Sequence, residues 1–288
     1  YLSSRAIKGI GPKLAEKILS TEGGAAVQTL SDAGRAVLVR RALEELQDNV
    51  HYYHRHRRSA AFCQMAAQTI DELKSAGLSG RQLAQLAGAC GAESGKLSEL
   101  ALIFQGYETL LARSGMDPSD RLELAGARLE EALARHSLPE FLRDRAVFID
   151  EFDTFNAPKK RLLGAMLAAL PSVTVALCDD GAPLLPGDLS LFSGAKQVAA
   201  QLRQLARKNG AEVAVPQLLR KDLRHRNAPG LAAVAELLET GSCTADATAG
   251  EVRLFAAPSR EEEARAAAGA IRRLMRQGVR CGKIAVVC

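Results

Sequence analysis

The segment Val147-Phe148-Ile149-Asp150-Glu151-Phe152-Asp153-Thr154-Phe155 decides the fold, because its short apolar run ends directly in acidic residues. A buried parallel strand reads as a continuous apolar run, and ligands bind where such a strand ends. Asp150 and Glu151 lie at that end. In a nucleotide-dependent motor, one carboxylate there holds Mg²⁺ and its neighbour polarises the attacking water. A strand followed by a helix cap explains the same residues without a ligand, because acids are common in turns.

Composition limits the class of protein. The 288 residues are enough for two domains, and the formal charge of +5 permits nucleic-acid binding without requiring it. The six cysteines are scattered and form no Cys-x-x-Cys pair, so we expect reduced thiols and no bound metal. No run approaches the roughly 18 apolar residues that span a bilayer, and the first residues lack a signal-peptide pattern. We therefore expect a cytoplasmic protein that does not contact a membrane.

Apolar spacing divides the chain into three stretches. Residues 1–145 are expected to form a helical insertion domain, because apolar residues recur three and four apart from about residue 30 onward. Turn signals separate its helices, and at 114–120 Asp117 or Ser119 is expected to cap the helix that follows.

The other two stretches change period. Residues 146–240 contain short β-type runs at 147–149 and 173–177 with a helix between them, which predicts a βαβ unit. Residues 241–288 predict the start of a second such unit, with strands at 251–256 and 283–288 around a helix at 260–277. The predicted fold class is α/β, with two parallel-sheet lobes and a large all-helical insertion. Because the chain starts at Tyr1 and stops in a strand-like run, we expect it to be a piece of a longer polypeptide.

Residues 7–18 resemble the hairpin of a helix-hairpin-helix module. In such a hairpin, glycines let the backbone approach a phosphate and a helix N-terminus supplies amide donors. The candidate DNA contacts are Lys8, Gly9, Gly11 and Lys13. An ordinary Gly-Pro turn before a helix explains the same pattern.

Residues 51–58, His-Tyr-Tyr-His-Arg-His-Arg-Arg, mix cations with aromatic rings. Cations can bind phosphates and rings can stack on bases, so His54, Arg55, Arg57 and Arg58 are candidate DNA contacts. The alternative is a solvated helix face.

The order of these features resembles the N-terminal, helicase-like part of the AddB (RexB) family, within the UvrD-like superfamily 1 helicases. The segments that carry the resemblance are 29–35, 71–78, 96–107, 147–155, 178–180, 223–226, 261–271 and 283–287. The resemblance identifies the two expected lobes as RecA-like and puts 147–155 at the Walker B position. Residues 223–226 resemble a degenerate Asn-Tyr-Arg element, which makes Arg226 a candidate nucleotide contact, with a structural ion pair as the alternative.

The resemblance implies one component of an ATP-dependent helicase-nuclease that resects DNA double-strand breaks for recombinational repair. The implied partners are DNA and an AddA-like subunit, and the implied iron-sulfur cluster belongs to a nuclease domain outside these residues. The phosphate loop Gly-x-x-x-x-Gly-Lys-Ser/Thr does not occur in the sequence, so we expect neither a cofactor nor ATPase activity in this segment.

Two alternatives stay open. The family often has Gly where Glu151 stands, so the longer protein could be an ATP-dependent helicase that uses Mg²⁺ and ATP, with its phosphate loop elsewhere. The other alternative is an interaction scaffold that does not contact DNA.

Overall fold

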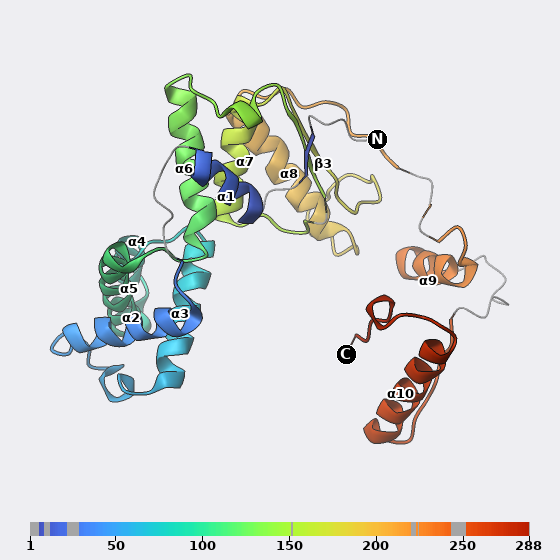
Figure 1. Ribbon diagram of the computed structural model, residues 1–288, viewed down its shortest axis with the longest axis horizontal. Coiled ribbons are helices and arrows are strands. Elements are labelled where there is room, and N and C mark those ends of the chain that lie inside the picture. The colour runs from blue at the N-terminus through green and yellow to red at the C-terminus, as the bar shows by residue number, and fades with distance from the viewer. Residues whose placement is uncertain are drawn as a thin grey trace. The chain divides into compact units, whose positions relative to one another are not determined.

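The computed structural model describes residues 6–8, 12–21, 29–150, 152–219, 223, 225–242 and 252–287. The chain divides into two compact units, Tyr1–Pro216 and Gln217–Cys288, and Figure 1 shows the elements of each. Unit 1 contains two separate hydrophobic cores, one among helices and one beside a small parallel sheet.

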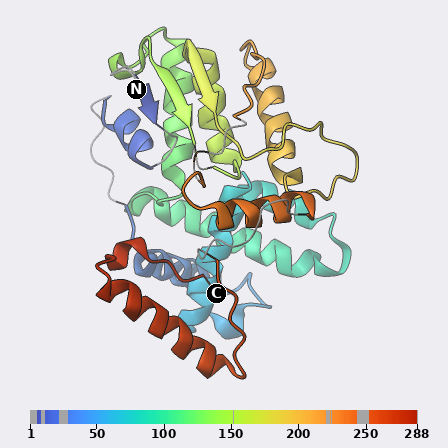
Figure 2. The ribbon, with the colours of Figure 1, turned by 90° about the vertical axis from the view of Figure 1, so that its right-hand side faces the viewer.

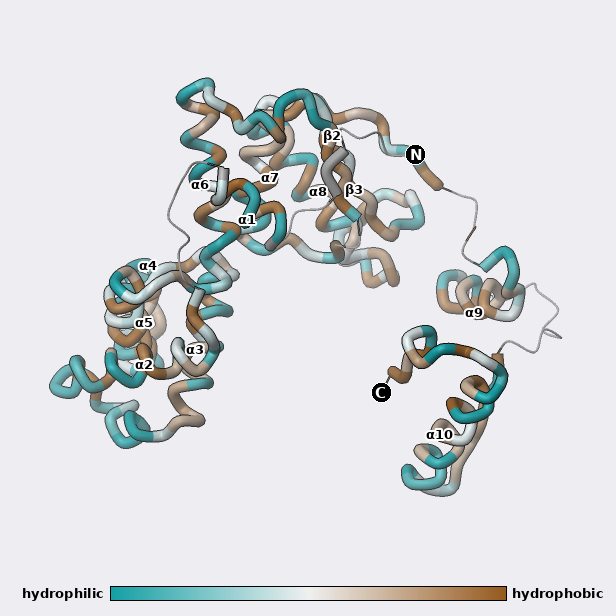
Figure 3. Tube along the Cα trace, viewed as in Figure 1, coloured by the Kyte–Doolittle hydropathy of each residue, from teal (hydrophilic) through white to brown (hydrophobic). Residues whose placement is uncertain are grey.

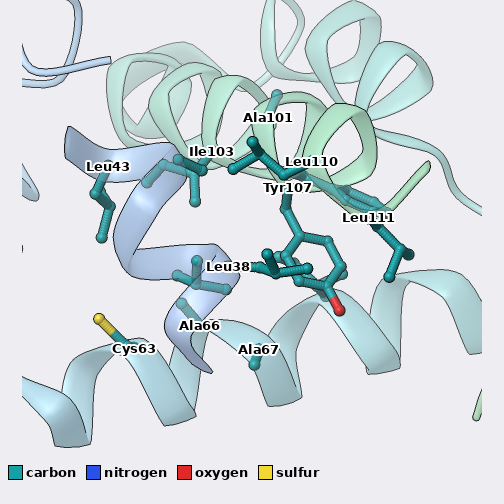
Figure 4. Close-up of a cluster of buried hydrophobic side chains, with 14 of the residues drawn as sticks. Leu38, Leu43, Cys63, Ala66, Ala67, Ala101, Ile103, Tyr107, Leu110 and Leu111 are labelled. Carbon is teal, nitrogen blue, oxygen red and sulfur yellow. The ribbon is translucent and has the colours of Figure 1, made fainter. Parts of the chain in front are cut away.

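The helical body of unit 1 is built from α2 (Asp32–Glu45), α3 (Ala60–Ser75), α4 (Gly80–Ala87) and α5 (Ser94–Ser114). Apolar side chains three and four positions apart on each helix meet in one buried cluster. Figure 4 shows this cluster, with Tyr107 reaching from α5 toward the other helices.

Serine caps begin three of these helices. Ser31, Ser59 and Ser79 each accept a hydrogen bond at the side-chain oxygen from a backbone N–H three residues later. Ser79 is part of a full capping box, because Gln82 bonds back to the Ser79 backbone N–H. Such caps satisfy N–H groups that the helix itself leaves unbonded, so they fix where each helix starts.

The sheet body of unit 1 contains the parallel strands β1 (Ala6–Lys8), β2 (Ala146–Ile149) and β3 (Ser172–Val175), in the order β1-β2-β3. Val147 is aligned with Ile7 on one side and with Val173 on the other. Figure 2 looks onto the strands, with helices behind them. Val147 and Ile149 are buried on the helix side, as the two-residue period of a strand requires.

Four helices of the described chain share the second core with the sheet. They are α1 (Pro12–Thr21), α6 (Asp120–Ala134), α7 (Ala157–Ala169) and α8 (Ser193–Lys208). β2, α7 and β3 form the βαβ unit that the sequence predicted, because α7 connects two parallel neighbouring strands. The mixed α/β class is therefore observed, although helices make up most of the structure.

The N-terminal segment differs from its predicted form. Ala6–Lys8 is a strand of the sheet, so it does not supply the first helix of a helix-hairpin-helix module. Gly9 and Gly11 lie outside the described residues. Pairing of residue 7 with residue 147 spans most of unit 1, and no local pattern reveals a contact of that range. The boundary of the helical insertion differs for the same reason, because both α1 and α6 pack beside the sheet rather than in the helical body.

Unit 2 contains α9 (Pro229–Thr240) and α10 (Arg260–Arg276), the second of which matches the predicted helix. α9 is largely apolar, whereas α10 is rich in charged residues (Figure 3). The strands predicted at 251–256 and 283–288 are not found where the structure describes them, since 252–257 and 284–287 are irregular. A strand needs a neighbour to bond its backbone, and the described part of unit 2 offers no strand beside either segment.

A search of the helices in the described ranges finds none that is both long and apolar enough to cross a bilayer.

A buried ionic network joins the helical body to α6. Asp117 lies between α5 and α6 with 0% of its surface exposed. It accepts hydrogen bonds from the Tyr107 hydroxyl and from Lys74 Nζ, the latter over 2.6 Å. Lys74 also donates to Asp120, the first residue of α6, over 2.8 Å.

The same network explains why the expected cap of α6 is not formed. The Ser119 hydroxyl donates to Asp71 on α3 over 3.1 Å, and Asp71 also binds Arg35 on α2. Both predicted cap residues are thus used to tie α6 to α3 and α5, and no side-chain cap bond is present at the start of α6. Tertiary partners have replaced the local bond.

The network shifts two pKa values in the same direction. Burial raises the pKa of Tyr107, and its hydrogen bond to Asp117 raises it further. Burial by itself lowers the pKa of Lys74, but hydrogen bonds to Asp117 and Asp120 outweigh this effect and the pKa is raised. The folded protein therefore holds both protons more tightly than the unfolded chain.

We expect stability to fall in alkali. A group with a raised folded pKa contributes fully below its unfolded pKa, about 10 for tyrosine, and the contribution is lost as pH rises toward the folded pKa. The free energy of unfolding in urea should decline from about pH 10 upward. Tyr107→Phe should decline less steeply over the same range, because one of the two protons is gone. Equal slopes for the two proteins would contradict this account.

We expect Lys74→Met to destabilise the chain by about 3–5 kcal/mol, because it leaves buried Asp117 without its cation. The control is Arg41→Met, which removes a cation from an exposed i,i+4 pair with Glu45 and should cost at most about 1 kcal/mol. Urea unfolding at neutral pH measures both. Similar costs for the two variants would show that the buried network contributes no more than a surface ion pair.

Candidate functional site

The acidic end of the sheet is the first candidate. Asp150 follows β2 directly and is exposed, while Glu151 lies outside the described residues. Asp179 and Asp180 follow β3, so they belong to the same edge, where parallel strands end together. A magnesium site would need oxygen ligands from these acids.

The acids after β3 are already bonded within their own loop. Asp179 and Asp180 accept backbone N–H bonds from Gly181 and Ala182, over 3.1 and 2.8 Å. Asp180 also binds Lys196, only 5% of which is exposed. The Ala182 N–H and the Lys196 ammonium hold the pKa of Asp180 below its ordinary value.

These bonds are typical of a folded turn rather than of an open metal site. Within the ranges that the structure describes, no group of three or more His, Cys, Asp or Glu side chains could hold a metal ion. These ranges therefore do not supply a magnesium or ATP site, and no chemical step can be derived through one.

Residues 51–58, here called the basic loop, form the second candidate. The loop connects α2 to α3 through turns and the short 3-10 helix His54–His56. It is thus not the solvated face of an α-helix. Its shape depends on side chains from α3 and α5.

Glu99 on α5 holds the start of the basic loop. Its carboxylate is 6% exposed and accepts backbone N–H bonds from three consecutive residues, His51, Tyr52 and Tyr53. The distances are 2.7 Å from His51, 3.0 and 2.9 Å from Tyr52, and 3.3 Å from Tyr53. Consecutive N–H groups that converge in this way form an anion-binding concavity, which Glu99 fills from inside the protein.

Aromatic contacts hold the rest of the loop. The rings of Tyr53 and His56 lie 5.4 and 5.6 Å from the ring of Phe62 on α3. Burial raises the pKa of Tyr53, and the nearby Glu99 carboxylate adds to the rise. Tyr53 therefore stays neutral and serves as an anchor.

The remaining side chains of the loop face outward. His54, Arg55 and Arg58 are exposed, and Arg57 is half-buried with Nη1 2.9 Å from Nδ1 of His54. The structure thus brings together the four predicted DNA contacts of this segment on one short, firmly held turn. Such a turn can bind phosphate groups without a large loss of conformational entropy.

The other predicted contacts do not join this surface. Lys13 is exposed on α1 in the sheet body, and the side chain of Lys8 lies outside the described part of the structure. Arg226 is exposed in a turn of unit 2, which is not placed relative to Asp150. Its predicted nucleotide contact stays a prediction.

A hollow of about 450 Å³ lies between α6, α7 and α8, with Lys160, Arg161 and Lys208 in its wall. Arg161 is held by Glu123 and Glu130, and Lys160 donates to Gln201. Two of the three cations are therefore already paired, and the hollow is a weaker anion site than the basic loop.

Glu99 was not among the predicted site residues. A signal was present, because Glu99 occupies the same helical stripe as Ile103 and Tyr107, four and eight residues later, where an apolar residue is expected. An acid on a buried stripe requires hydrogen-bond donors from elsewhere in the fold. The sequence shows that need but not which donors meet it.

Comparison with known proteins places the chain in a family. A family model described as "ADDB, N-terminal" matches residues 12–235. A protein of Symbiobacterium thermophilum is 33% identical over 96% of this chain and 24% of its own length. Proteins of Desulforudis audaxviator and Moorella thermoacetica are each 32% identical over 92% of the chain and 23% of their own length.

All three relatives are named as the second, or B-type, component of an ATP-dependent helicase/deoxyribonuclease, and the chain spans about a quarter of their length. The family model covers both the helical body and the sheet body, from α1 to within α9. The chain therefore belongs to the family of AddB N-terminal domains.

Proposed function

We propose that this chain is a DNA-contacting part of an AddB-type helicase-nuclease component and that it does not hydrolyse ATP by itself. The names of the relatives support a role in a helicase-nuclease. The single observation that carries DNA contact is the basic loop, a group of exposed cations held in one shape by Glu99.

Charge and burial favour this loop over other cationic sites. Many arginines elsewhere are paired on the surface, as Arg41 is with Glu45 and Arg135 with Glu131. Within the described structure, Arg55 and Arg58 form no ion pair with an acid. Cations without acidic partners release counterions when they bind phosphates, which is the main source of affinity for DNA.

The absence of ATP hydrolysis is supported by the sequence. No phosphate loop of the form Gly-x-x-x-x-Gly-Lys-Ser/Thr occurs in it, so backbone amides and a lysine that would hold the phosphates are lacking. The β2-α7-β3 unit, with Asp150 at its end, is compatible with part of a RecA-like lobe that keeps its scaffold without the chemistry.

The wider role follows from the family. A component of a helicase-nuclease requires a partner, and we propose an AddA-like motor that unwinds DNA ends during double-strand-break repair in the cytoplasm. Mg²⁺, ATP and an iron-sulfur cluster would then be bound by other parts of the assembly. An ATP-dependent helicase with its phosphate loop elsewhere, and a scaffold without DNA contact, are the outcomes against which the proposal is tested.

We expect this chain to bind a DNA end with a strong salt dependence. In fluorescence anisotropy over roughly 50 to 200 mM salt, Arg55→Ala/Arg58→Ala should bind about 10-fold or more weakly and lower the salt slope by about two. The control, Arg41→Ala/Arg135→Ala, removes the same charge from exposed ion pairs and should change binding little. Equal losses in both variants would indicate nonspecific attraction, and no binding at low salt would favour the scaffold.

We expect no ATP hydrolysis above the buffer background, with or without DNA and Mg²⁺, in a phosphate-release assay. Turnover that disappears in Asp150→Ala would contradict the proposal and favour the competent-helicase alternative. The Lys8→Ala variant is a control, because it lies on a neighbouring strand and should not alter a background rate.

A further inference from the structure

Tyr52 is an exposed aromatic residue inside the basic loop. It is 56% exposed, whereas its neighbour Tyr53 is packed against Phe62. An exposed tyrosine ring beside arginines offers a flat apolar surface next to positive charge. Unpaired DNA bases stack on such rings while cations bind the adjacent phosphates.

The Tyr52 ring has a fixed support. Gly95, near the start of α5, lies under the ring, and a Cβ added to Gly95 would come within 2.9 Å of Tyr52 Cε2. Such a distance is a clash, so glycine is required for the ring to lie where it does. One part of the ring rests on α5 and the rest is open to solvent.

The Tyr52 backbone has a fixed support as well. Its N–H donates to both oxygens of Glu99, which also binds the N–H groups on either side. The backbone and the ring of Tyr52 are therefore both positioned from α5, by residues four apart on that helix. A stacking residue held in this way loses little entropy when a base binds.

We propose that the basic loop binds an unpaired DNA strand in preference to duplex, with Tyr52 as the stacking residue and Glu99 as its positioning residue. This inference rests on the proposed function, because it names the form of DNA that the loop takes. In a duplex the bases are stacked on one another and covered by the backbone, so Tyr52 would find no base to contact. Duplex would meet only the cations.

Glu99 allows positioning to be separated from charge. Glu99→Gln removes a negative charge beside the cationic loop, so simple electrostatics predicts tighter binding of DNA. If Glu99 positions Tyr52, the same change weakens binding of single strands, because an amide cannot accept bonds at both ends from three N–H groups. Glu93→Gln is the matched control, since Glu93 directly precedes α5, is 61% exposed and pairs with Lys96.

The experiment is a titration of the full chain with labelled oligothymidylate and with a blunt duplex of equal length, each about 16 nucleotides. We expect tighter binding of the single strand. Tyr52→Ala and Gly95→Ala should each weaken it by roughly 5- to 100-fold, Tyr52→Phe should keep it, and all three should leave duplex binding within about 2-fold. Glu99→Gln should weaken, and Glu93→Gln should not weaken, binding of the single strand.

The outcomes separate the inference from the proposed function. Equal binding of both DNA forms, unchanged by Tyr52→Ala, would overturn the single-strand preference and leave DNA contact intact. No binding of either form would overturn both. If Glu99→Gln lowers the thermal unfolding temperature so far that it cannot be titrated, Gly95→Ala still tests positioning, because it displaces the ring without changing charge. Tighter single-strand binding by Glu99→Gln would show that its charge alone matters.

Discussion

A buried carboxylate at the end of α5 is the constraint on which unit 1 depends. Asp117 cannot remain charged inside the protein unless donors reach it, because a buried ion without partners costs several kcal/mol. Its donors come from α5 through Tyr107 and from α3 through Lys74. Lys74 then reaches Asp120, the first residue of α6. The need to satisfy one carboxylate thus fixes the direction in which α6 leaves the helical body.

The α6 helix carries that constraint to the sheet. It packs on α7, the helix that connects β2 to β3, and Arg161 on α7 binds Glu123 and Glu130 on α6. The two hydrophobic cores of unit 1 are therefore linked by a helix whose start is ionic and whose middle is apolar. Leu129 on α6 and Leu162 on α7 are both fully buried in the sheet core.

A second buried carboxylate acts at the opposite end of α5. The helix has 21 residues and is thus roughly 30 Å long, with Glu99 near its start and Asp117 just beyond its end. Glu99 binds backbone and Asp117 binds side chains, yet each fixes a segment that the hydrophobic core does not hold. At one end that segment is the start of α6, and at the other it is the basic loop, the surface that we propose for DNA.

Much of this fold could be predicted from the sequence, because hydrophobic periodicity reports which face of an element is buried. It located the helices of the helical body, the βαβ unit from β2 to β3, and the helix α10. The motifs also identified the family, and the composition of residues 51–58 identified the cationic candidate surface. What periodicity does not report is the partner of each buried face. Only the tertiary structure decided that Ala6–Lys8 joins the sheet, that Asp117 is an ionic junction rather than a cap, and that Glu99 holds the basic loop. Each depends on contacts between residues far apart in the chain, whose geometry exists only after the elements have packed.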